Sequence, residues 1–417
     1  MKLSIKLLVA SAASLVAVAA TADTTGVKTQ SRVLVKKMGA HCVDDSNCFN
    51  RYHPAIKPVM TAKTGQLVTF ETRDALDSDL NVNSVPKDLG AVDLNLVHPL
   101  TGPVSIEGAK RGDVLAVTLV DIDPDEYGYT TVVPGFGFLR DRFTEPYIAN
   151  WKLNRMEAMS DQLPGVRIPF NGFMGTVGVL PGLPEVDAWE ARETQLGKAG
   201  GVALPPQPTG ALPAAVCGPN GSHKDKCLRT IPPRENGGNM DIKQMVVGTT
   251  LLLPCYVDGC GLFIGDVHYA QGDGEVAGTA IEMGATVTVR TEIRKGAASL
   301  MKSGPHFEGG SQLKKLEPDR FHATVAYPIK KAGEIPPQHK YLGGDKIGPL
   351  INLSEDLTVA ARGSLNEMID WLAKAYGWTP VQAYVYASVA CDLRIGNVVD
   401  VPNYAVSTIC PLEHISK

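Results

Sequence analysis

The stretch that most constrains this chain is residues 261–282, which read GLFIGDVHYAQGDGEVAGTAIE. Glycines are interspersed with acidic residues and one histidine, in a run that otherwise alternates as β-strands do. Asp266 and His268 lie two positions apart. Because successive side chains of a strand point to opposite faces, an extended chain would direct both residues to the same side. Carboxylate and imidazole are frequent ligands of first-row metals, so this spacing predicts a pair of metal ligands.

The residues after this pair are typical of a chain reversal. The Asp273-Gly274 step supplies the positive backbone dihedrals of a tight hairpin, and we expect Glu275 to open the return strand beside the outgoing one. A carboxylate near a metal pair suits metal-assisted hydrolysis, in which the metal lowers the pKa of water and a base takes its proton. We expect Glu275 to be that base, with Glu282 as the alternative. A polar hairpin with solvated charges is the competing interpretation.

A second glycine-rich stretch, residues 233–244, reads PRENGGNMDIKQ and precedes a hydrophobic, strand-like run. Paired glycines let backbone amides approach a small polar ligand closely. Asp241 would add a third oxygen donor to the metal pair, and Lys243 would assist catalysis electrostatically. We expect three residues of this loop to contact the substrate, namely Gly237, Gly238 and Asn239.

Together the two stretches resemble the acetamidase/formamidase family, whose members hydrolyse short aliphatic amides to ammonia and a carboxylate. The matching residues are ENGGNMDIK and, farther along, GDVHYAQGDGEVAGTAIE. Further matches are HPLTGP at residues 98–103 and SVACDL at residues 388–393. The resemblance covers nearly all of the chain after the first 22 residues, in the same order. It implies a jelly-roll-type β-sandwich with added α/β elements.

The expected reaction is hydrolysis of a small carboxamide, similar to formamide or acetamide, at a divalent metal. Asp241, Asp266 and His268 would hold the ion. These donors suit zinc better than calcium, although manganese or iron would also be satisfied. The metal would activate water and polarise the carbonyl.

Three other residues have two interpretations each. His98 is a further metal ligand or substrate contact, or it is a histidine that hydrogen-bonds a loop backbone. Phe138 and Phe173 belong to the Gly- and Pro-rich stretch 121–184, which has the appearance of long loops. They either wall off a small amide pocket or fill the core beneath those loops.

The composition and patterning predict a mainly β protein, a jelly-roll-type β-sandwich with an α+β C-terminal portion. The 42 glycines and 29 prolines indicate many turns. Residues 23–300 would form the β-sandwich amidase core, with a long loop insertion at about 185–233. Residues 301–417 would complete the same catalytic unit, with a helix capped by Ser354 and a second helix opening at Thr379-Pro380.

The first 22 residues have the pattern of a secretory signal peptide: two lysines, a short apolar run and a small-x-small ending. We therefore expect an exported protein, periplasmic or secreted. No later apolar run is long enough to span a membrane, so we expect no membrane partner. The net charge of −4 provides no basic surface for nucleic acid. We expect the protein to be a homo-oligomer.

Eight cysteines in an exported chain predict disulfides. Although eight cysteines allow 105 connectivities, they stand as isolated pairs in separate regions, which favours local pairing. The expected bonds are Cys42–Cys48, Cys217–Cys227, Cys255–Cys260 and Cys391–Cys410. The competing hypothesis makes Cys255 a thiol nucleophile beside Glu235 and Lys243.

A different functional class is also open, because many sandwiches of this kind are binding modules and a fold alone does not establish catalysis. In that case the protein would be an exported jelly-roll protein that binds a small polar ligand or a metal without chemistry. A simple binder needs no glutamate beside the metal pair, so the joint presence of the two acidic, glycine-rich stretches favours the hydrolase.

Overall fold

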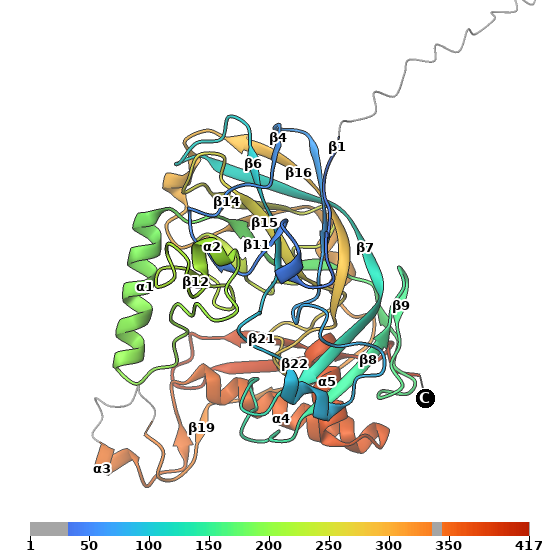
Figure 1. The fold of residues 1–417 in the computed structure, drawn as a ribbon. Coiled ribbons are helices and arrows are strands. Elements are labelled where there is room, and N and C mark those ends of the chain that lie inside the picture. Colours follow the sequence, from blue (N-terminus) through green and yellow to red (C-terminus); the bar gives the residue numbers. More distant parts are fainter. Residues whose placement is uncertain (1–31, 336–343, 417) are drawn as a thin grey trace, which may run out of the picture. The chain divides into compact units, whose positions relative to one another are not determined.

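The computed structural model describes residues 32–335 and 344–416, and the chain from Arg32 onward packs as one compact unit (Figure 1). The predicted signal peptide, residues 1–22, lies outside the described residues. Among the helices in the described part of the chain, none has the length and apolar character needed to cross a membrane.

One large sheet of 13 strands makes up the body of the unit. Its main path runs β13-β11-β15-β16-β7-β14-β17, while β5 also pairs with β16, β6 with β15, and β8 with β7. The strands are β1 (Arg32–Val35), β2 (Cys48–Phe49), β4 (Met60–Ala62), β5 (Leu67–Thr72), β6 (Leu100–Ile106), β7 (Val114–Val132), β8 (Tyr147–Lys152), β11 (Phe173–Val179), β13 (Gly237–Asn239), β14 (Thr250–Pro254), β15 (Leu262–His268), β16 (Glu282–Arg294) and β17 (His306–Glu308).

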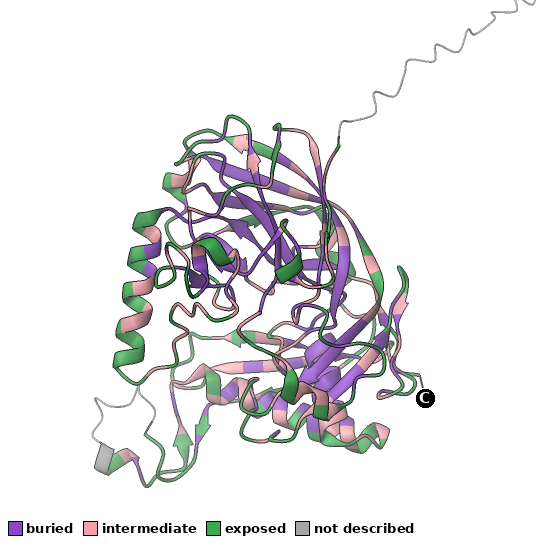
Figure 2. Cartoon of the chain, in the orientation of Figure 1, coloured by how far each residue is buried: buried purple, intermediate pink, exposed green. Residues whose placement is uncertain are grey.

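The hydrophobic core lies along this sheet, whose strands are largely buried (Figure 2). Strands β5 and β16 show how the sequence produces it. Val68 and Phe70 pair with Val289 and Val287 across the antiparallel ladder, and all four are fully buried. Their alternation with polar residues is the period of two that a strand requires. Burying side chains of this size stabilises the fold by about 1.5–3 kcal/mol each.

Smaller elements surround the large sheet. The short strand pairs are β3 (Arg51–Tyr52) with β12 (Leu228–Arg229), β9 (Glu157–Ala158) with β10 (Ile168–Pro169), and β19 (Ile329–Lys330) with β20 (Asn352–Leu353). The helices are α1 (Leu183–Lys198), α2 (Ala214–Cys217), α3 (Gly344–Ile347), α4 (Leu357–Tyr376) and α5 (Pro380–Ala390), with 3-10 turns η1 (Cys42–Asp44), η2 (Pro86–Ala91), η3 (Ala297–Leu300) and η4 (Ser311–Leu316).

The C-terminal portion has the predicted α+β character. Helices α4 and α5 accompany a sheet of β18 (Phe321–Ala326), β22 (Ala405–Pro411) and β21 (Asp392–Asn397). Helix α5 begins at Pro380, as predicted, and Thr379 and Gln382 form a capping box at its start. The cap of α4 is Asp356, which accepts from Thr358 N–H, and Ser354 was the wrong prediction. The Ser354 hydroxyl donates to the Pro328 carbonyl instead.

Two stretches expected to be loops contain regular structure. Residues 183–198 form α1, which starts with Pro184 in its first turn and buries only Val186 and Trp189, so its sequence has a weak apolar period. The stretch 121–184 contains the later part of β7, followed by β8 and β11. Strand β7 continues to Val132 because it pairs with β16 and then with β8. Long-range pairing of this kind leaves no local signal in a sequence.

All four predicted disulfides are present: Cys42–Cys48, Cys217–Cys227, Cys255–Cys260 and Cys391–Cys410. Since Cys255 is bonded to Cys260, it has no free thiol, and the hypothesis of a Cys255 nucleophile was wrong.

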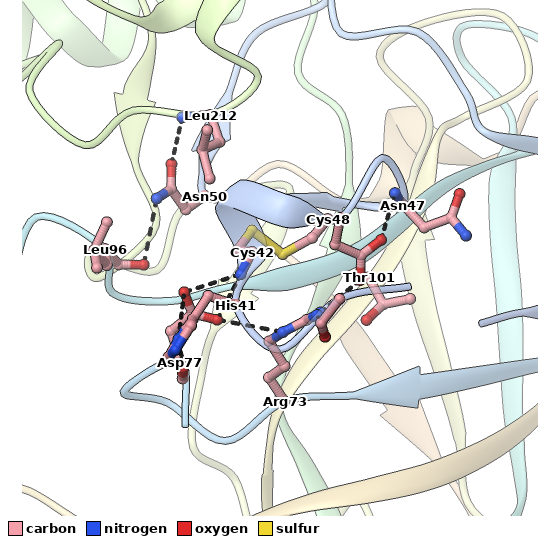
Figure 3. Close-up of a disulfide and its surroundings, with 12 residues drawn as sticks. His41, Cys42, Asn47, Cys48, Asn50, Arg73, Asp77, Leu96, Thr101 and Leu212 are labelled. Carbon is pink, nitrogen blue, oxygen red and sulfur yellow. Dashed lines mark hydrogen bonds and ion pairs between the residues drawn. A yellow bond between two sulfur atoms is a disulfide. The ribbon is translucent and has the colours of Figure 1, made fainter. Parts of the chain in front are cut away.

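The Cys42–Cys48 bond lies beside a buried ion cluster centred on Arg73 (Figure 3). The guanidinium is 1% exposed, with Nη1 2.7 Å from Asp45 Oδ2 and Nε 3.3 Å from Asp77 Oδ1. Both oxygens of Asp77 also accept the Cys42 N–H, at 2.9 and 3.0 Å. Charged groups can be buried at low cost only when each is paired and hydrogen-bonded, as Arg73, Asp45 and Asp77 are here.

Arg73→Leu is therefore expected to lower the free energy of unfolding by about 3–5 kcal/mol, because Asp45 and Asp77 would remain buried and uncompensated. Denaturant titration measures this loss. Arg155→Leu is the matched control, since Arg155 pairs with Asp121 and Asp123 at a half-exposed position, and its loss should stay below about 1 kcal/mol. Equal losses in the two variants would show that Arg73 is not needed to neutralise the buried carboxylates.

Candidate active site

Four ionisable side chains converge at one end of strands β15 and β16. His268 Nε2, on β15, lies 3.1 Å from Glu282 Oε2, at the start of β16. The same nitrogen is 3.4 Å from Asp266 Oδ1 and 3.9 Å from Asp241 Oδ1. Asp241 follows β13, so residues far apart in the sequence meet because β13, β11 and β15 are neighbours. The predicted convergence of Asp241, Asp266 and His268 is thus present in the structure.

The atoms that face one another are buried and lack ordinary hydrogen bonds. They are Asp241 Oδ1, Asp266 Oδ1, His268 Nε2 and Glu282 Oε2, none of which forms a hydrogen bond within the described part of the chain. A buried polar atom without a partner costs about 1–3 kcal/mol. Four such atoms pointing at one place indicate a site built for a bound positive charge.

The backbone at three acidic residues is strained. Asp241 and Asp266 both have φ of +50°, and Glu275 has φ of +43°. Side-chain-bearing residues seldom adopt this left-handed region, which costs about 1–3 kcal/mol per residue and clusters at functional sites. The strain aims the carboxyl groups in directions that a regular strand or loop would not provide.

Gly175 on β11 makes room for this arrangement. The pairing of β11 with β15 joins Met174 to Val267 and Thr176 to Gly265 in one register, so Gly175 lies opposite Asp266. A Cβ at Gly175 would lie 2.6 Å from the Asp266 carbonyl oxygen and 2.8 Å from His268 Nε2. The sequence predicts that Asp266 and His268 converge by simple strand alternation. In the structure they converge through a backbone kink at Asp266, opposite a glycine.

The predicted tight hairpin after His268 is also wrong. His268 pairs directly with Glu282, and residues 269–281 form a loop between β15 and β16. Helix α5 holds this loop in place: Ser388 Oγ accepts from Ala277 N–H at 3.0 Å and donates to the Thr279 carbonyl at 2.7 Å. Glu275 sits inside this loop and does not open the return strand. Its carboxyl group still reaches the cluster, within 4.8 Å of ligand atoms of His268 and Glu282.

Burial of several acidic groups perturbs their ionisation. Burial raises the pKa of Glu275 to about 8 and that of Glu282 to about 8. Burial and the adjacent Glu275 raise the pKa of Asp241 well above its usual range. Burial disfavours a charged His268, but Glu282 and Asp266 outweigh it and raise the pKa of the imidazole. The site therefore takes up protons near neutral pH unless another positive charge joins it.

Two residues that the sequence did not single out, Thr176 and Gln271, support the cluster. Thr176 Oγ1 lies 3.1 Å from Asp266 Oδ2 and 2.9 Å from Asn239 Oδ1. Gln271 bonds both His268 and the Asp241 backbone. No spacing pattern could have identified them, because their roles depend on the kinked strand and the loop.

His98 and Phe173 border the cluster. His98 Nε2 lies 3.8 Å from Asp266 Oδ2, and the backbone N–H of His98 donates to Thr230 Oγ1. The Phe173 ring meets the His268 ring edge to face, with centroids 5.1 Å apart. Phe138 lies elsewhere: its ring is 5.7 Å from the Arg362 guanidinium of α4, so it packs beside the loop and not against the metal-ligand candidates.

The predicted roles of Lys243, Gly237 and Gly238 do not fit their surroundings. The Lys243 ammonium is buried against the Asp392 carboxylate. The Gly237 N–H donates to the Arg234 carbonyl, so it cannot serve a ligand. A Cβ at Gly238 would lie 2.9 Å from the Tyr52 hydroxyl. The paired glycines are therefore needed for close packing of β13.

Gly175→Ala is expected to destabilise the protein by about 1–3 kcal/mol, because the added methyl group overpacks the site and must displace His268 or Asp266. Gly175 does not have a positive φ, so the effect comes from space alone. Gly90→Ala is the control, since a Cβ there meets nothing within 4 Å. Thermal unfolding of the two variants checks this, and an unperturbed Gly175→Ala would contradict the close approach.

Comparison with known proteins agrees with the geometry. Residues 36–416 match the model of the Acetamidase/Formamidase family. An acetamidase of Mycolicibacterium smegmatis is 31% identical over 366 residues, covering 81% of this chain and 84% of the relative. A formamidase of Methylophilus methylotrophus is 29% identical over 392 residues, covering 88% and 89%. The structure of a gamma lactamase from Delftia acidovorans is similar with a TM-score of 0.82 and 29% identity, covering 93% and 94%. The chain therefore belongs to the acetamidase/formamidase family of amide hydrolases.

Proposed function

We propose that this protein hydrolyses a small carboxamide with the help of a divalent cation held by Asp241, Asp266 and His268. The observation that supports the cation is the set of buried, unpaired oxygen and nitrogen atoms directed at one place. Two carboxylates and an imidazole suit zinc, and Glu282 lies beside them, with Oε2 3.1 Å from His268 Nε2. His98 lies at the edge of the set, where it would be a further ligand or contact substrate.

A divalent cation bound there would supply Lewis acidity, which lowers the pKa of water and polarises a carbonyl. The protein's own side chains carry out the proton transfers. Glu275 takes a proton from the attacking water, whose oxygen bonds to the amide carbon. The same proton then passes to the nitrogen as the carbon–nitrogen bond breaks, releasing ammonia and a carboxylic acid that ionises. Burial raises the pKa of Glu275 and a bound cation would lower it again, and the two opposed effects favour a carboxyl group that both accepts and donates a proton near neutral pH.

Binding of the amide falls to residues beside the cluster. Asn239 is half-buried, and its side chain is already oriented by Thr176. Its remaining amide hydrogens are available to the substrate carbonyl. The Phe173 ring packs against the His268 ring and excludes water from that side of the imidazole, which strengthens the electrostatic interactions inside the site.

A cyclic amide is the second candidate substrate. The observation that favours it is the similarity to a gamma lactamase over 93% of this chain. A lactam and a linear amide present the same carbonyl and nitrogen to Glu275, and only the leaving amine differs, because in a lactam it stays attached to the acid.

We also propose that the enzyme acts outside the cytoplasm, since its four disulfides are of the kind that persists in oxidising compartments. The homo-oligomeric state remains a prediction.

Glu275→Gln should retain the cation and lose turnover by about a hundredfold to ten-thousandfold, because it removes only the acid–base group. Asp266→Asn should lose cation binding as well as turnover. Metal analysis and kcat on each purified variant separate the two effects, with exposed Glu107→Gln as the control. Full turnover in Glu275→Gln would dismiss its role as the base and leave Glu282 to be tested in the same way.

Chelator treatment should abolish hydrolysis, and added Zn²⁺ should restore it. Ammonia release from formamide and acetamide measures the linear reaction, and ring opening of a five-membered lactam measures the cyclic one. Undiminished turnover in protein shown by elemental analysis to be metal-free would refute the cation and leave the family reaction intact. Turnover of the lactam alone would favour the second substrate.

A further inference from the structure

We propose that Gln271 is a positioning residue that keeps the proton of His268 on Nδ1, so that Nε2 presents its lone pair to the cation. The inference rests on the proposed cation site, and it assigns a role to a side chain that is not itself one of the proposed ligands. The two hydrogen bonds of Gln271 are its basis.

Gln271 is 5% exposed and lies between two parts of the site. Its Oε1 is 2.8 Å from His268 Nδ1, and its Nε2 is 2.7 Å from the backbone oxygen of Asp241. The side chain therefore links an imidazole ligand of β15 to the loop that bears a carboxylate ligand.

The identity of the Asp241 atom decides the direction of both bonds. A backbone carbonyl oxygen can only accept, so the group facing it must be the NH₂ of Gln271. The other end of the amide is then its carbonyl oxygen, which also can only accept. Hence His268 Nδ1 must carry the proton, and in the neutral ring Nε2 is left bare.

The rest of the cluster favours the opposite tautomer. Nε2 lies 3.1 Å from Glu282 Oε2 and 3.4 Å from Asp266 Oδ1, and both oxygens would accept an Nε2–H. A proton on Nε2 would occupy the place of the cation. Gln271 favours the proton on Nδ1, because its Oε1 accepts a hydrogen bond there.

The backbone fixes Gln271 in this position. The neighbouring Gly272 N–H donates to the Ser388 carbonyl of α5 at 2.8 Å, and a Cβ on Gly272 would lie 2.0 Å from the Cys391 carbonyl oxygen. The side chain also forms part of the wall of a cavity of about 630 Å³, together with Lys243 and Asn171. Shortening the side chain would therefore open the site toward this cavity, so a test variant has to keep its volume.

Gln271→Met keeps the volume and removes both hydrogen bonds, and it is expected to weaken Zn²⁺ binding by about tenfold to a hundredfold. Gln271→Glu keeps an acceptor at Nδ1 and should recover most of that affinity, even though it loses the bond to Asp241. Competition with a chromogenic chelator measures both. Gln195→Met, at an exposed position of α1, is the control.

The tautomer itself is read without metal, from a long-range ¹H–¹⁵N spectrum of the histidine rings in the metal-free full chain, at a pH above the raised pKa of His268, where the ring is neutral. Wild type and Gln271→Glu should show His268 protonated at Nδ1, and Gln271→Met should lose that signal or move the proton to Nε2. An unchanged His268 spectrum with unchanged Zn²⁺ affinity in folded Gln271→Met would overturn the proposal. Failure of wild type to bind Zn²⁺ would refute the cation site, whereas the spectrum would still decide the role of Gln271.

Discussion

The structure depends on keeping several acidic groups and one imidazole together in a place from which water is largely removed. Charges of one sign in such surroundings repel strongly, and each carboxyl group also loses its hydration. Asp241, Glu275 and Glu282 respond with raised pKa values. The arrangement is stable only if protons or a cation offset the negative charge. The surrounding fold supplies the rigidity that prevents these groups from separating.

That rigidity has identifiable sources. The pairing of β11 with β15 places Gly175 opposite Asp266, and the missing Cβ leaves room for the Asp266 backbone and the His268 ring. Helix α5 holds the loop of Glu275 through Ser388 and through the Gly272 backbone. The C-terminal portion therefore contributes to the site although it provides none of the proposed ligands. Strained φ values at Asp241, Asp266 and Glu275 are maintained by this packing, as expected where function requires a costly conformation.

Membership of an amide hydrolase family and the geometry of the cluster are independent observations that agree. The family defines the bond that is cleaved, and the cluster explains how a weak nucleophile such as water could attack it. The binder without catalysis, considered from the sequence, would have no use for a protonatable carboxyl group beside the proposed cation ligands. The raised pKa of Glu275 gives that group a chemical purpose.

Sequence alone determined the mainly β character, the α+β C-terminal portion, all four disulfides and the trio Asp241, Asp266 and His268, because these depend on periodicity, on isolated cysteine pairs and on short motifs. Only the tertiary structure decided how the trio converges. A left-handed kink at Asp266 opposite Gly175 replaced simple strand alternation, and a loop held by α5 replaced the tight hairpin. Lys243 was misjudged because its partner, Asp392, is remote in sequence. Gln271, Thr176 and Asp392 act through contacts between segments distant along the chain, and such contacts leave no pattern in the order of residues.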